Sequence, residues 1–282
     1  MSSQVTLVSV IIPTFNRAKF VTDAIESVLK QSYENIEMII VDDGSTDETP
    51  PLLQRYSDRA QLIRTENRGV SAARNTGFKQ SKGELVCFLD SDDYWLEKKV
   101  ERQIDYFARH PEMHICQTGE IWIRHGRRVN PKKKHRKLDG WIYERSLELC
   151  IVTPSAVMMK RSLLDDVGLF DEEMPVCEDY DLWLRIASQY PIGLIEENLV
   201  VKHGGHEDQL SDNWGLDRWR VFAMEKMLKS GALTESQKKE TIAELINKCR
   251  IYSQGCEKRE KLDEAVRFRN KINHYALLLD EQ

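Results

Sequence analysis

Two clusters of acidic residues carry the strongest chemical signal in this sequence of 282 residues. Asp42-Asp43-Gly44 follows the apolar run Ile39-Ile40-Val41, and Asp90-Ser91-Asp92-Asp93 follows the apolar run 85–89. Short apolar runs indicate buried strands, and open α/β sheets bind ligands at the carboxyl ends of their strands. Carboxylates gathered there repel one another unless a cation or a donor-rich ligand compensates, and oxygen ligands suit Mg²⁺ or Mn²⁺. Asp and Gly are also common in turns, but two clusters on consecutive units favour a metal-bound nucleotide.

The elements that must hold these clusters alternate between strand and helix over the first hundred residues. Apolar runs predict strands at 8–12, 38–41, 61–63 and 85–89. Helical spacing and capping residues predict helices at 20–29, from 49 onward, at 71–80 and at 96–109. This alternation predicts an α/β fold with a doubly wound, mostly parallel sheet. The glycine-rich phosphate-binding motifs of dehydrogenases and P-loop nucleotidases are absent from the sequence, which argues against both classes.

The pattern changes after residue 110. We expect strands at 115–123 and 156–159, a short helix at 143–150, a helix entered through Glu178-Asp179, and a loop containing His203 and His206. Beyond Trp214 the spacing of apolar residues predicts two amphipathic helices that turn near Gly255. These patterns divide the chain into a first α/β half at 1–110, a second half of mixed pattern at 111–212, and a helical hairpin at 213–282.

Composition and charge fit a cytoplasmic enzyme. The chain is 41% hydrophobic and 31% charged, and it contains neither a run of about 18 apolar residues nor the pattern of a signal peptide. Its six cysteines include no Cys-x-x-Cys pair, which argues against a zinc site and a disulfide framework. A net charge of −5 gives no general attraction to nucleic acid, so we expect no such partner.

One basic stretch departs from that overall charge. Residues 124–137 include eight Lys or Arg and no carboxylate. Such a stretch is often a solvated loop, but it could also attract an anionic acceptor or the inner face of a membrane, at about 1 kcal/mol for each basic residue near the surface. It holds too few aromatic residues for a nucleic-acid stacking platform. Exposed apolar faces on the terminal helices could in turn form a homodimer.

Five segments, taken in order, resemble the family 2 glycosyltransferases. They are Val10-Ile11-Ile12-Pro13-Thr14-Phe15-Asn16-Arg17, Val41-Asp42-Asp43-Gly44-Ser45-Thr46-Asp47, Asn67-Arg68-Gly69-Val70-Ser71-Ala72-Ala73-Arg74-Asn75, Phe88-Leu89-Asp90-Ser91-Asp92-Asp93 and Cys177-Glu178-Asp179. The resemblance covers about residues 7–210 and implies a GT-A fold. It also implies an inverting transfer of a sugar from a nucleoside diphosphate sugar, with UDP favoured, to a hydroxyl of a glycan or lipid-linked acceptor. Mn²⁺ or Mg²⁺ would bind the diphosphate.

The resemblance assigns roles to individual residues. The residues implied to bind the nucleotide sugar are Pro13, Thr14, Phe15, Asn16, Arg17, Asp42, Asp43, Asn67, Arg74, Asp90 and Ser91. Either Asp42 or Asp43 would accept a hydrogen bond from a uracil-type imide, and Arg74, near the mouth, would face the nucleotide or diphosphate. Asp92 is implied to bind the metal. His206 is implied to complete the metal site, although His203 lies only three residues away and is the alternative.

The remaining reactive group is implied to be Asp179, which resembles the general base of the family. A base must lie within about 2.6–3.2 Å of the acceptor hydroxyl that it deprotonates. Glu178 would orient this loop or bind the acceptor. The alternative for Glu178 is a carboxylate that is merely favoured by the dipole at the start of a helix.

Two other functions remain open from the sequence. A phosphatase of the haloacid dehalogenase type also has an Asp-x-Asp after an apolar strand, but it requires Thr or Val where this chain has Asp93. A non-catalytic glycan-binding module of degenerate transferase fold is the second alternative. The joint presence of Asp90, Asp92 and Asp179 argues against degeneration.

Overall fold

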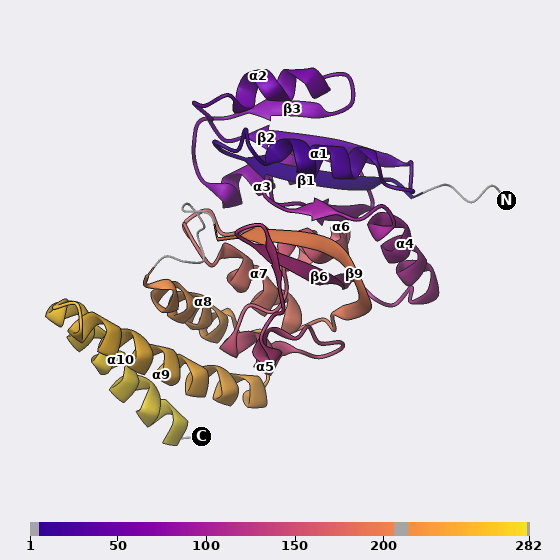
Figure 1. Cartoon of the computed structure of the whole chain (residues 1–282). Coiled ribbons are helices and arrows are strands. Elements are labelled where there is room, and N and C mark those ends of the chain that lie inside the picture. The colour runs from indigo at the N-terminus through magenta and orange to yellow at the C-terminus, as the bar shows by residue number, and fades with distance from the viewer. Residues whose placement is uncertain (1–5, 206–213, 281–282) are drawn as a thin grey trace.

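The computed structural model describes residues 6–205 and 214–280 (Figure 1). Its strands are β1 Val8–Thr14, β2 Ile36–Asp42, β3 Gln61–Arg64, β4 Leu85–Phe88, β5 Tyr94–Trp95, β6 Ile115–Arg124, β7 Arg127–Val129, β8 Val157–Lys160 and β9 Gly193–Gly204. Its α-helices are α1 Val21–Leu29, α2 Thr49–Leu53, α3 Val70–Gln80, α4 Lys99–Arg109, α5 Tyr143–Glu148, α6 Arg161–Val167, α7 Glu178–Ala187, α8 Leu216–Ser230, α9 Glu235–Glu257 and α10 Leu262–Asp280. The expected α/β fold with a helical C-terminal part is confirmed.

The described strands form a single sheet in the order β3-β2-β1-β4-β8-β6-β9-β5, with β7 paired to β6. β3, β2, β1 and β4 are parallel to one another. In the sheet, β2 and β3 lie on one side of β1, whereas β4 lies on its other side. The direction in which successive strands are added therefore reverses between β1 and β4. Such a reversal opens a crevice at the carboxyl ends of the strands.

The register of this parallel half brings the acidic clusters to the same edge. Thr14 pairs with Asp42, and Ile11 pairs with Phe88. The Asp43 N–H then donates to the Thr14 carbonyl at 2.9 Å. The residues after β1, β2 and β4 therefore meet at the edge that the apolar runs predicted.

The sheet is buried on both faces, as its strand composition requires. Val8, Val10 and Ile12 of β1 pack into one core cluster with residues of α1 and α4. Ile11 points to the opposite face and joins a second core, which includes residues of α5, α7, α8, α9 and α10. This alternation follows from the two-residue period of a strand. It explains why β1 reads as a nearly continuous apolar run, interrupted by Ser9.

The second half of the sheet mixes strand directions. β8 lies antiparallel to both β4 and β6, and β9 lies parallel to β6. His203 and Gly204 were expected in a loop, but they pair with Ile123 and Arg124 as the end of β9. The ladder with β6 continues that far, so this stretch of backbone is fixed.

The C-terminal part folds as three helices. α9 and α10 lie side by side and form the expected hairpin (Figure 1). The predicted turn position was wrong, because α9 continues through Gly255 to Glu257, and Glu260 is the turn residue that adopts positive φ (59°). No helix within residues 6–205 and 214–280 is long and apolar enough to span a membrane. The division of the chain at residues 110 and 212 stays a prediction.

Candidate active site

A cavity of about 730 Å³ opens at the carboxyl ends of β1 and β4, between the starts of α3 and α7. It collects nearly all of the residues singled out from the sequence. Those lining it are Pro13, Thr14, Phe15, Asn16, Arg17, Asp43, Asn67, Arg74, Asp90, Ser91, Asp92, Glu178 and Asp179. His203 also lines it, whereas His206 lies outside the described residues.

Asp42 and Asp43 have different positions, although both are buried. Asp42 is not among the lining residues; its carboxylate accepts a bond from the Ser45 N–H at 2.9 Å and lies 3.6 Å from Arg64 Nε. Asp43 lines the cavity and accepts a bond from the Gly69 N–H at 2.8 Å. Gly69 adopts φ of 91°, a conformation that favours glycine. Of Asp42 and Asp43, the geometry therefore favours Asp43 as the residue that contacts a nucleobase.

The loop after β1 is tied to the loop after β2. Asn16 adopts a left-handed φ of 52°, and its side-chain oxygen accepts the Thr46 N–H at 2.8 Å. The Asn16 N–H donates to Ser45 Oγ at 2.9 Å, and the Arg17 N–H donates to Thr49 Oγ1 at 2.9 Å. Through these hydrogen bonds, Asn16 stabilises the conformation of the loop after β1. Phe15 stays exposed at the cavity, where its ring can contact a planar ligand.

Arg74 is buried rather than placed near the mouth as expected. Its Nη1 donates to Glu178 Oε1 and its Nη2 to Asp90 Oδ1, each at 2.7 Å. The guanidinium also lies over the Phe170 ring, 4.9 Å from its centroid. Burial opposes the charge of Arg74, but Asp90 and Glu178 outweigh it and raise its pKa. Arg74 therefore joins the Asp-x-Asp segment to the start of α7.

Glu178 and Asp179 begin α7 in different environments. Glu178 is buried, and burial together with repulsion from Asp179 raises its pKa to about 7 despite the Arg74 contact. Asp179 is only partly buried and lines the cavity. Its Oδ1 accepts the Tyr180 N–H at 2.7 Å, and its Oδ2 lies 3.4 Å from the Cys150 thiol, which can donate to it. Asp179 is thus the more accessible carboxylate of the pair.

The residue before this pair has an unusual backbone conformation. Cys177 adopts φ of 61° and ψ of 21°, in the left-handed region, at the N-cap of α7. Residues other than glycine adopt this conformation at an energetic cost, and such strain is often found at functional sites. Here it turns the chain so that the next two carboxylates face the cavity.

Asp93 fastens the Asp-x-Asp segment to the end of β9. Its Oδ1 accepts the His203 N–H at 3.1 Å, and its Oδ2 accepts the Ser155 hydroxyl at 2.7 Å. Burial raises the pKa of Asp93, and repulsion from Asp92 and Asp90 adds to it. His203 Nδ1 lies 3.0 Å from the Asp92 carbonyl oxygen. The two candidate metal-binding segments are therefore held next to each other.

The residues around Asp92 fit a divalent cation whose coordination is shared between the protein and a bound substrate. The described part of the chain contains no group of three or more His, Cys, Asp or Glu side chains close enough to hold a metal alone. Mg²⁺ commonly binds through one or two carboxylates, with water and substrate phosphates supplying the rest. Asp92 and Asp90 provide carboxylates in the same cavity, and both repel the buried carboxylate of Asp93, so a cation is favoured there.

Several lining residues were not predicted from the sequence. Cys150, Lys202, Leu216 and Arg220 come from segments without a recognisable motif. The basic stretch also differs from a solvated loop at one end, because Lys137 is buried and lies 2.9 Å from Glu120. Burial opposes the charge of Glu120, but Lys137 and Lys202 outweigh it and lower the pKa to about 2. Only the tertiary structure brings these groups together.

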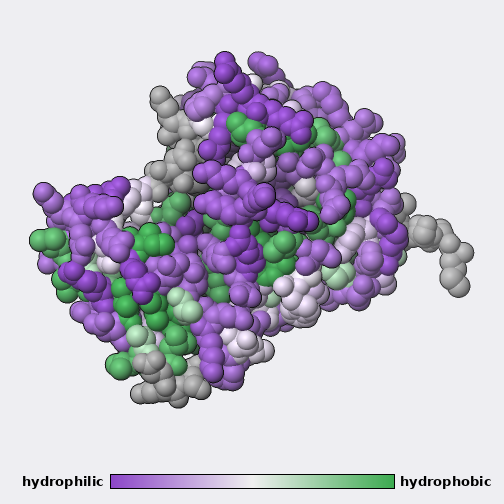
Figure 2. Space-filling model, turned by 60° about the horizontal axis from the view of Figure 1, so that its bottom comes forward, coloured by the Kyte–Doolittle hydropathy of each residue, from purple (hydrophilic) through white to green (hydrophobic). Residues whose placement is uncertain are grey.

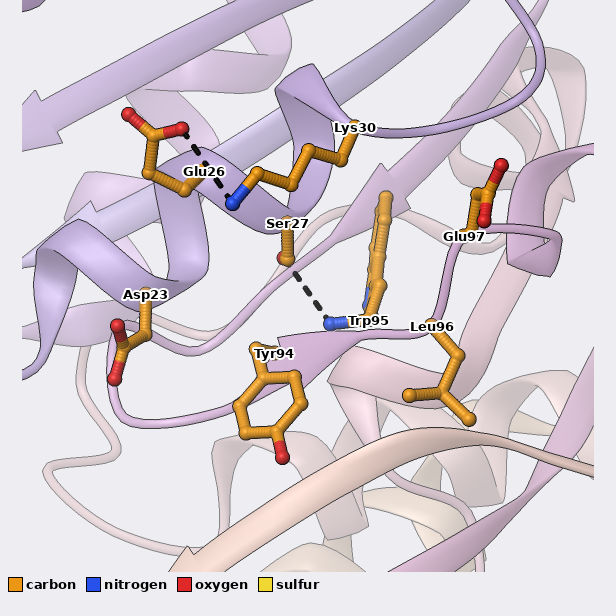
Figure 3. Close-up of a pocket in the computed structure, with 8 residues that line it drawn as sticks. All are labelled: Asp23, Glu26, Ser27, Lys30, Tyr94, Trp95, Leu96 and Glu97. Carbon is orange, nitrogen blue, oxygen red and sulfur yellow. Dashed lines mark hydrogen bonds and ion pairs between the residues drawn. The ribbon is translucent and has the colours of Figure 1, made fainter.

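A second hollow of about 710 Å³ lies between α1 and β5. Figure 3 shows Asp23, Glu26 and Glu97 at its edge, with Ser27 Oγ accepting the Trp95 N–H at 3.1 Å. None of the residues expected to bind donor, metal or acceptor lines it. We therefore assign the candidate active site to the first cavity.

Comparison with known proteins decides the family. The family model described as Glycosyl transferase family 2 matches residues 9–168. An uncharacterized glycosyltransferase of Rickettsia typhi is 30% identical over 250 residues, which cover 84% of this chain and 74% of the relative. The chain belongs to the family 2 glycosyltransferases. This membership excludes the phosphatase. Together with relatives named as glycosyltransferases, it supports an enzyme of the hexosyltransferase type over the non-catalytic module.

Other relatives differ from this chain in length, and one of them has a more specific name. An uncharacterized glycosyltransferase of Rickettsia felis is 31% identical over 216 residues, but the match spans only 35% of that relative. WfgD of Escherichia coli is 34% identical over 213 residues, covering 73% of this chain and 80% of WfgD. WfgD is described as a UDP-Glc:α-D-GlcNAc-diphosphoundecaprenol β-1,3-glucosyltransferase.

Solved structures confirm the GT-A fold. TarS residues 1–349 of S. aureus, in complex with UDP-GlcNAc, superpose with a TM-score of 0.77 at 22% identity, over 95% of this chain and 80% of that one. The mannosyltransferase PcManGT of Pyrobaculum calidifontis, in complex with GDP-Man and Mn²⁺, gives a TM-score of 0.65 at 20% identity, over 99% of this chain and 80% of that one. At these identities the likeness concerns the fold alone.

Proposed function

We propose that the protein transfers a sugar from a UDP-sugar to a hydroxyl of a glycan or lipid-linked acceptor, with inversion at the anomeric carbon. The observation that carries this proposal is the arrangement of carboxylates in one cavity. Asp43 and Asp92 lie on the strand side, and Asp179 lines the cavity on the α7 side, with its Oδ2 3.4 Å from the Cys150 thiol. The name of WfgD, with its UDP-sugar donor and lipid-linked acceptor, supports the same assignment.

In this proposal the strand side binds the donor. Phe15 contacts the base, and Asp43, already aligned by the Gly69 N–H, accepts the imide N–H of uracil. Asp90 is held by Arg74 and faces the ribose. Asp92, with His206 or His203, would hold Mn²⁺ or Mg²⁺, which offsets the charge that develops on the leaving diphosphate.

Asp179 acts as the general base on the opposite side of the cavity. Its carboxylate removes the proton from the acceptor hydroxyl while that oxygen attacks the anomeric carbon from the face opposite the leaving group. Glu178, bonded to Arg74, orients the start of α7. The Cys150 thiol, whose pKa is raised by burial and by Asp179, stays protonated and can donate to the carboxylate.

A donor panel tests the proposed function. The protein is incubated with UDP-, GDP- and dTDP-sugars and a lipid-linked acceptor, with and without Mn²⁺, and the anomeric configuration of the product is read by NMR. We expect metal-dependent transfer from a UDP-sugar with inverted configuration. Transfer with retention, or equal rates after metal removal by a chelator, would contradict the mechanism.

We further propose that the basic stretch brings the protein to the inner face of an anionic membrane. Arg127, Arg128 and the residues 132–134 are exposed, in contrast to Lys137. The stretch lies beside the active site, because Arg124 pairs with Gly204 at the end of β9. If the protein is cytoplasmic and its acceptor is lipid-linked, attraction of this stretch to the membrane would bring the active site close to the acceptor.

A homodimer through the C-terminal helices is a separate proposal. Figure 2 shows hydrophobic side chains gathered over this part of the molecule, where Ile251, Leu262, Val266 and Leu277 are exposed. Exposed apolar patches of this kind often mark interaction sites. Sedimentation of the protein at increasing concentration tests the dimer, and a monomer throughout would contradict it.

A further inference from the structure

Helix α8 supplies the cavity with a cation from outside the segment that matches the family model. Leu216 and Arg220 of α8 line the cavity together with Cys150 and Asp179, whereas the matched segment ends at residue 168. α8 packs against α7, which begins with Glu178 and Asp179 (Figure 1). The wall next to the candidate base is therefore built partly by the C-terminal helices.

The guanidinium of Arg220 is held by an ion pair, but not all of its N–H groups have a hydrogen-bond partner among the described residues. Its Nη1 donates to Asp217 Oδ1 at 2.8 Å, and Asp217 also lies 3.9 Å from Lys248 Nζ. Within the part of the chain that the structure describes, the buried Nε of Arg220 has no hydrogen-bond partner. A guanidinium that is held by a carboxylate on one arm presents its remaining N–H groups in a geometry that matches phosphate oxygens.

The position of Arg220 associates it with the acceptor rather than the donor. It lies near Cys150 and Cys177: burial raises the pKa of both thiols, and the positive charge of Arg220 partly offsets that rise. The Cys150 thiol in turn contacts Asp179. Arg74, a buried arginine that also lines the cavity, is bonded to Asp90 and Glu178. An anionic acceptor would meet repulsion from Glu178 and Asp179, and Arg220 on α8 is a cation lining the same cavity that can offset it.

We propose that Arg220 binds a phosphate group of the acceptor, next to the sugar whose hydroxyl Asp179 deprotonates. The inference rests on the proposed function and narrows its acceptor to a glycan linked through phosphate. A lipid diphosphate and a phosphodiester-linked polymer share this chemistry, and the acceptors below distinguish them.

Three synthetic acceptors that carry the same N-acetylglucosamine test the proposal. In the first the sugar is linked to a short alkyl chain through an α-diphosphate, in the second through a phosphodiester, and in the third directly as a neutral glycoside. Acceptor KM, donor KM and kcat are measured for wild type, Arg220→Gln, Arg220→Lys and the control Arg218→Gln. Arg218 lies on the same helix, is exposed and pairs with Glu264 at 3.6 Å.

For Arg220→Gln we expect the KM of a phosphate-linked acceptor to rise about tenfold or more, the effect of losing a charged hydrogen bond. The KM of the neutral glycoside and of the donor should stay unchanged, and Arg220→Lys should recover part of the loss. A rise limited to the diphosphate acceptor identifies a lipid diphosphate, and a rise with the phosphodiester identifies the polymer linkage. Equal losses with all three acceptors, or a rise in donor KM, would overturn the assignment of Arg220.

A binding measurement separates this inference from the proposed function. Wild type and Arg220→Gln, each saturated with UDP and Mn²⁺, are titrated calorimetrically with the diphosphate acceptor. Arg220-dependent binding without transfer by wild type would contradict the proposed reaction but support the phosphate site. Transfer to all three acceptors without any dependence on Arg220 would contradict the phosphate site alone.

Discussion

At the scale of single residues, the site depends on side chains that are paired with one another across different elements. Arg74 holds Asp90 and Glu178 at 2.7 Å each, and Asp93 links Ser155 to the backbone of His203. Charge-assisted hydrogen bonds of this kind fix side-chain positions well. Of the two carboxylates at the start of α7, Asp179 is the more exposed, and it accepts hydrogen bonds from the Tyr180 N–H and the Cys150 thiol.

The raised pKa of Glu178, about 7, predicts how stability varies with pH. An unfolded Glu titrates near 4.3, so the folded state holds this proton more tightly. That contribution to stability is complete below about pH 4.3 and is lost as the pH rises through about 7. Glu178→Gln cannot ionise and should lose less stability across this window.

Urea denaturation of wild type and Glu178→Gln between pH 4.5 and pH 8 measures this difference. The exposed Glu84→Gln variant is the control and should follow wild type. Parallel curves for wild type and Glu178→Gln would mean that Glu178 is already ionised throughout the range.

The role of Asp92 predicts a metal-dependent effect on ligand binding. A ligand present at a hundred times its Kd adds about 2.7 kcal/mol to the stability of the native state. UDP with Mn²⁺ should therefore raise the Tm of wild type more than UDP alone. Asp92→Asn should abolish the extra shift, while Asp23→Asn, a control on the exposed side of α1, should keep it. An undiminished shift in Asp92→Asn would remove Asp92 from the metal site.

At the scale of elements, the N-cap residue of α7, Cys177, has a left-handed conformation that directs Glu178 and Asp179 toward the cavity. Because a β-branched side chain is strongly disfavoured at φ of 61°, Cys177→Val should lower stability by about 1–2 kcal/mol relative to Cys177→Ser. The transfer rate should fall with it, since Glu178 and Asp179 follow directly. Thermal melting and rate measurements of the two variants, with Cys177→Gly as the unstrained reference, check this. Equal behaviour of Val and Ser would show that the strain is unimportant.

The parallel half of the fold was predictable because its signals are local. The apolar runs of β1, β2 and β4 are continuous, and the acidic motifs follow them directly. β9 was missed because Glu196-Glu197-Asn198 interrupts its apolar pattern and its pairing with β6 shifts register near Gly119. β5 has only two residues, too few for a periodic signal.

The site was predictable where motifs lie within one segment and unpredictable where they do not. The residues around Asp43, Asp90 and Asp179 were found because each group is contiguous. Arg74 carries no sign in the sequence that it will be buried between two carboxylates. Arg220 reaches the cavity only because α8 packs on α7. Contacts of this kind depend on packing between distant segments.

At the scale of the whole molecule, the basic stretch predicts salt-sensitive membrane binding. Replacing Lys132, Lys133 and Lys134 by Ala should weaken binding to vesicles with anionic lipid, by about 1 kcal/mol for each lysine near the surface. Vesicle flotation at increasing salt measures the effect. A control triple variant at Lys30, Lys79 and Lys82, exposed positions elsewhere in the chain, should bind as wild type does. Loss of binding in both variants would indicate a general charge effect.

The central claim is that Asp179 is the general base of an inverting sugar transfer. Asp179→Asn keeps the size of the side chain but cannot take the acceptor proton, so the transfer rate should fall by about 10²–10⁴. UDP-sugar affinity, measured in parallel with Mn²⁺ present, should stay within about twofold of wild type, because Asp179 lies on the acceptor side in this account. Near-normal transfer by Asp179→Asn, or an equal collapse of donor binding, would contradict the account.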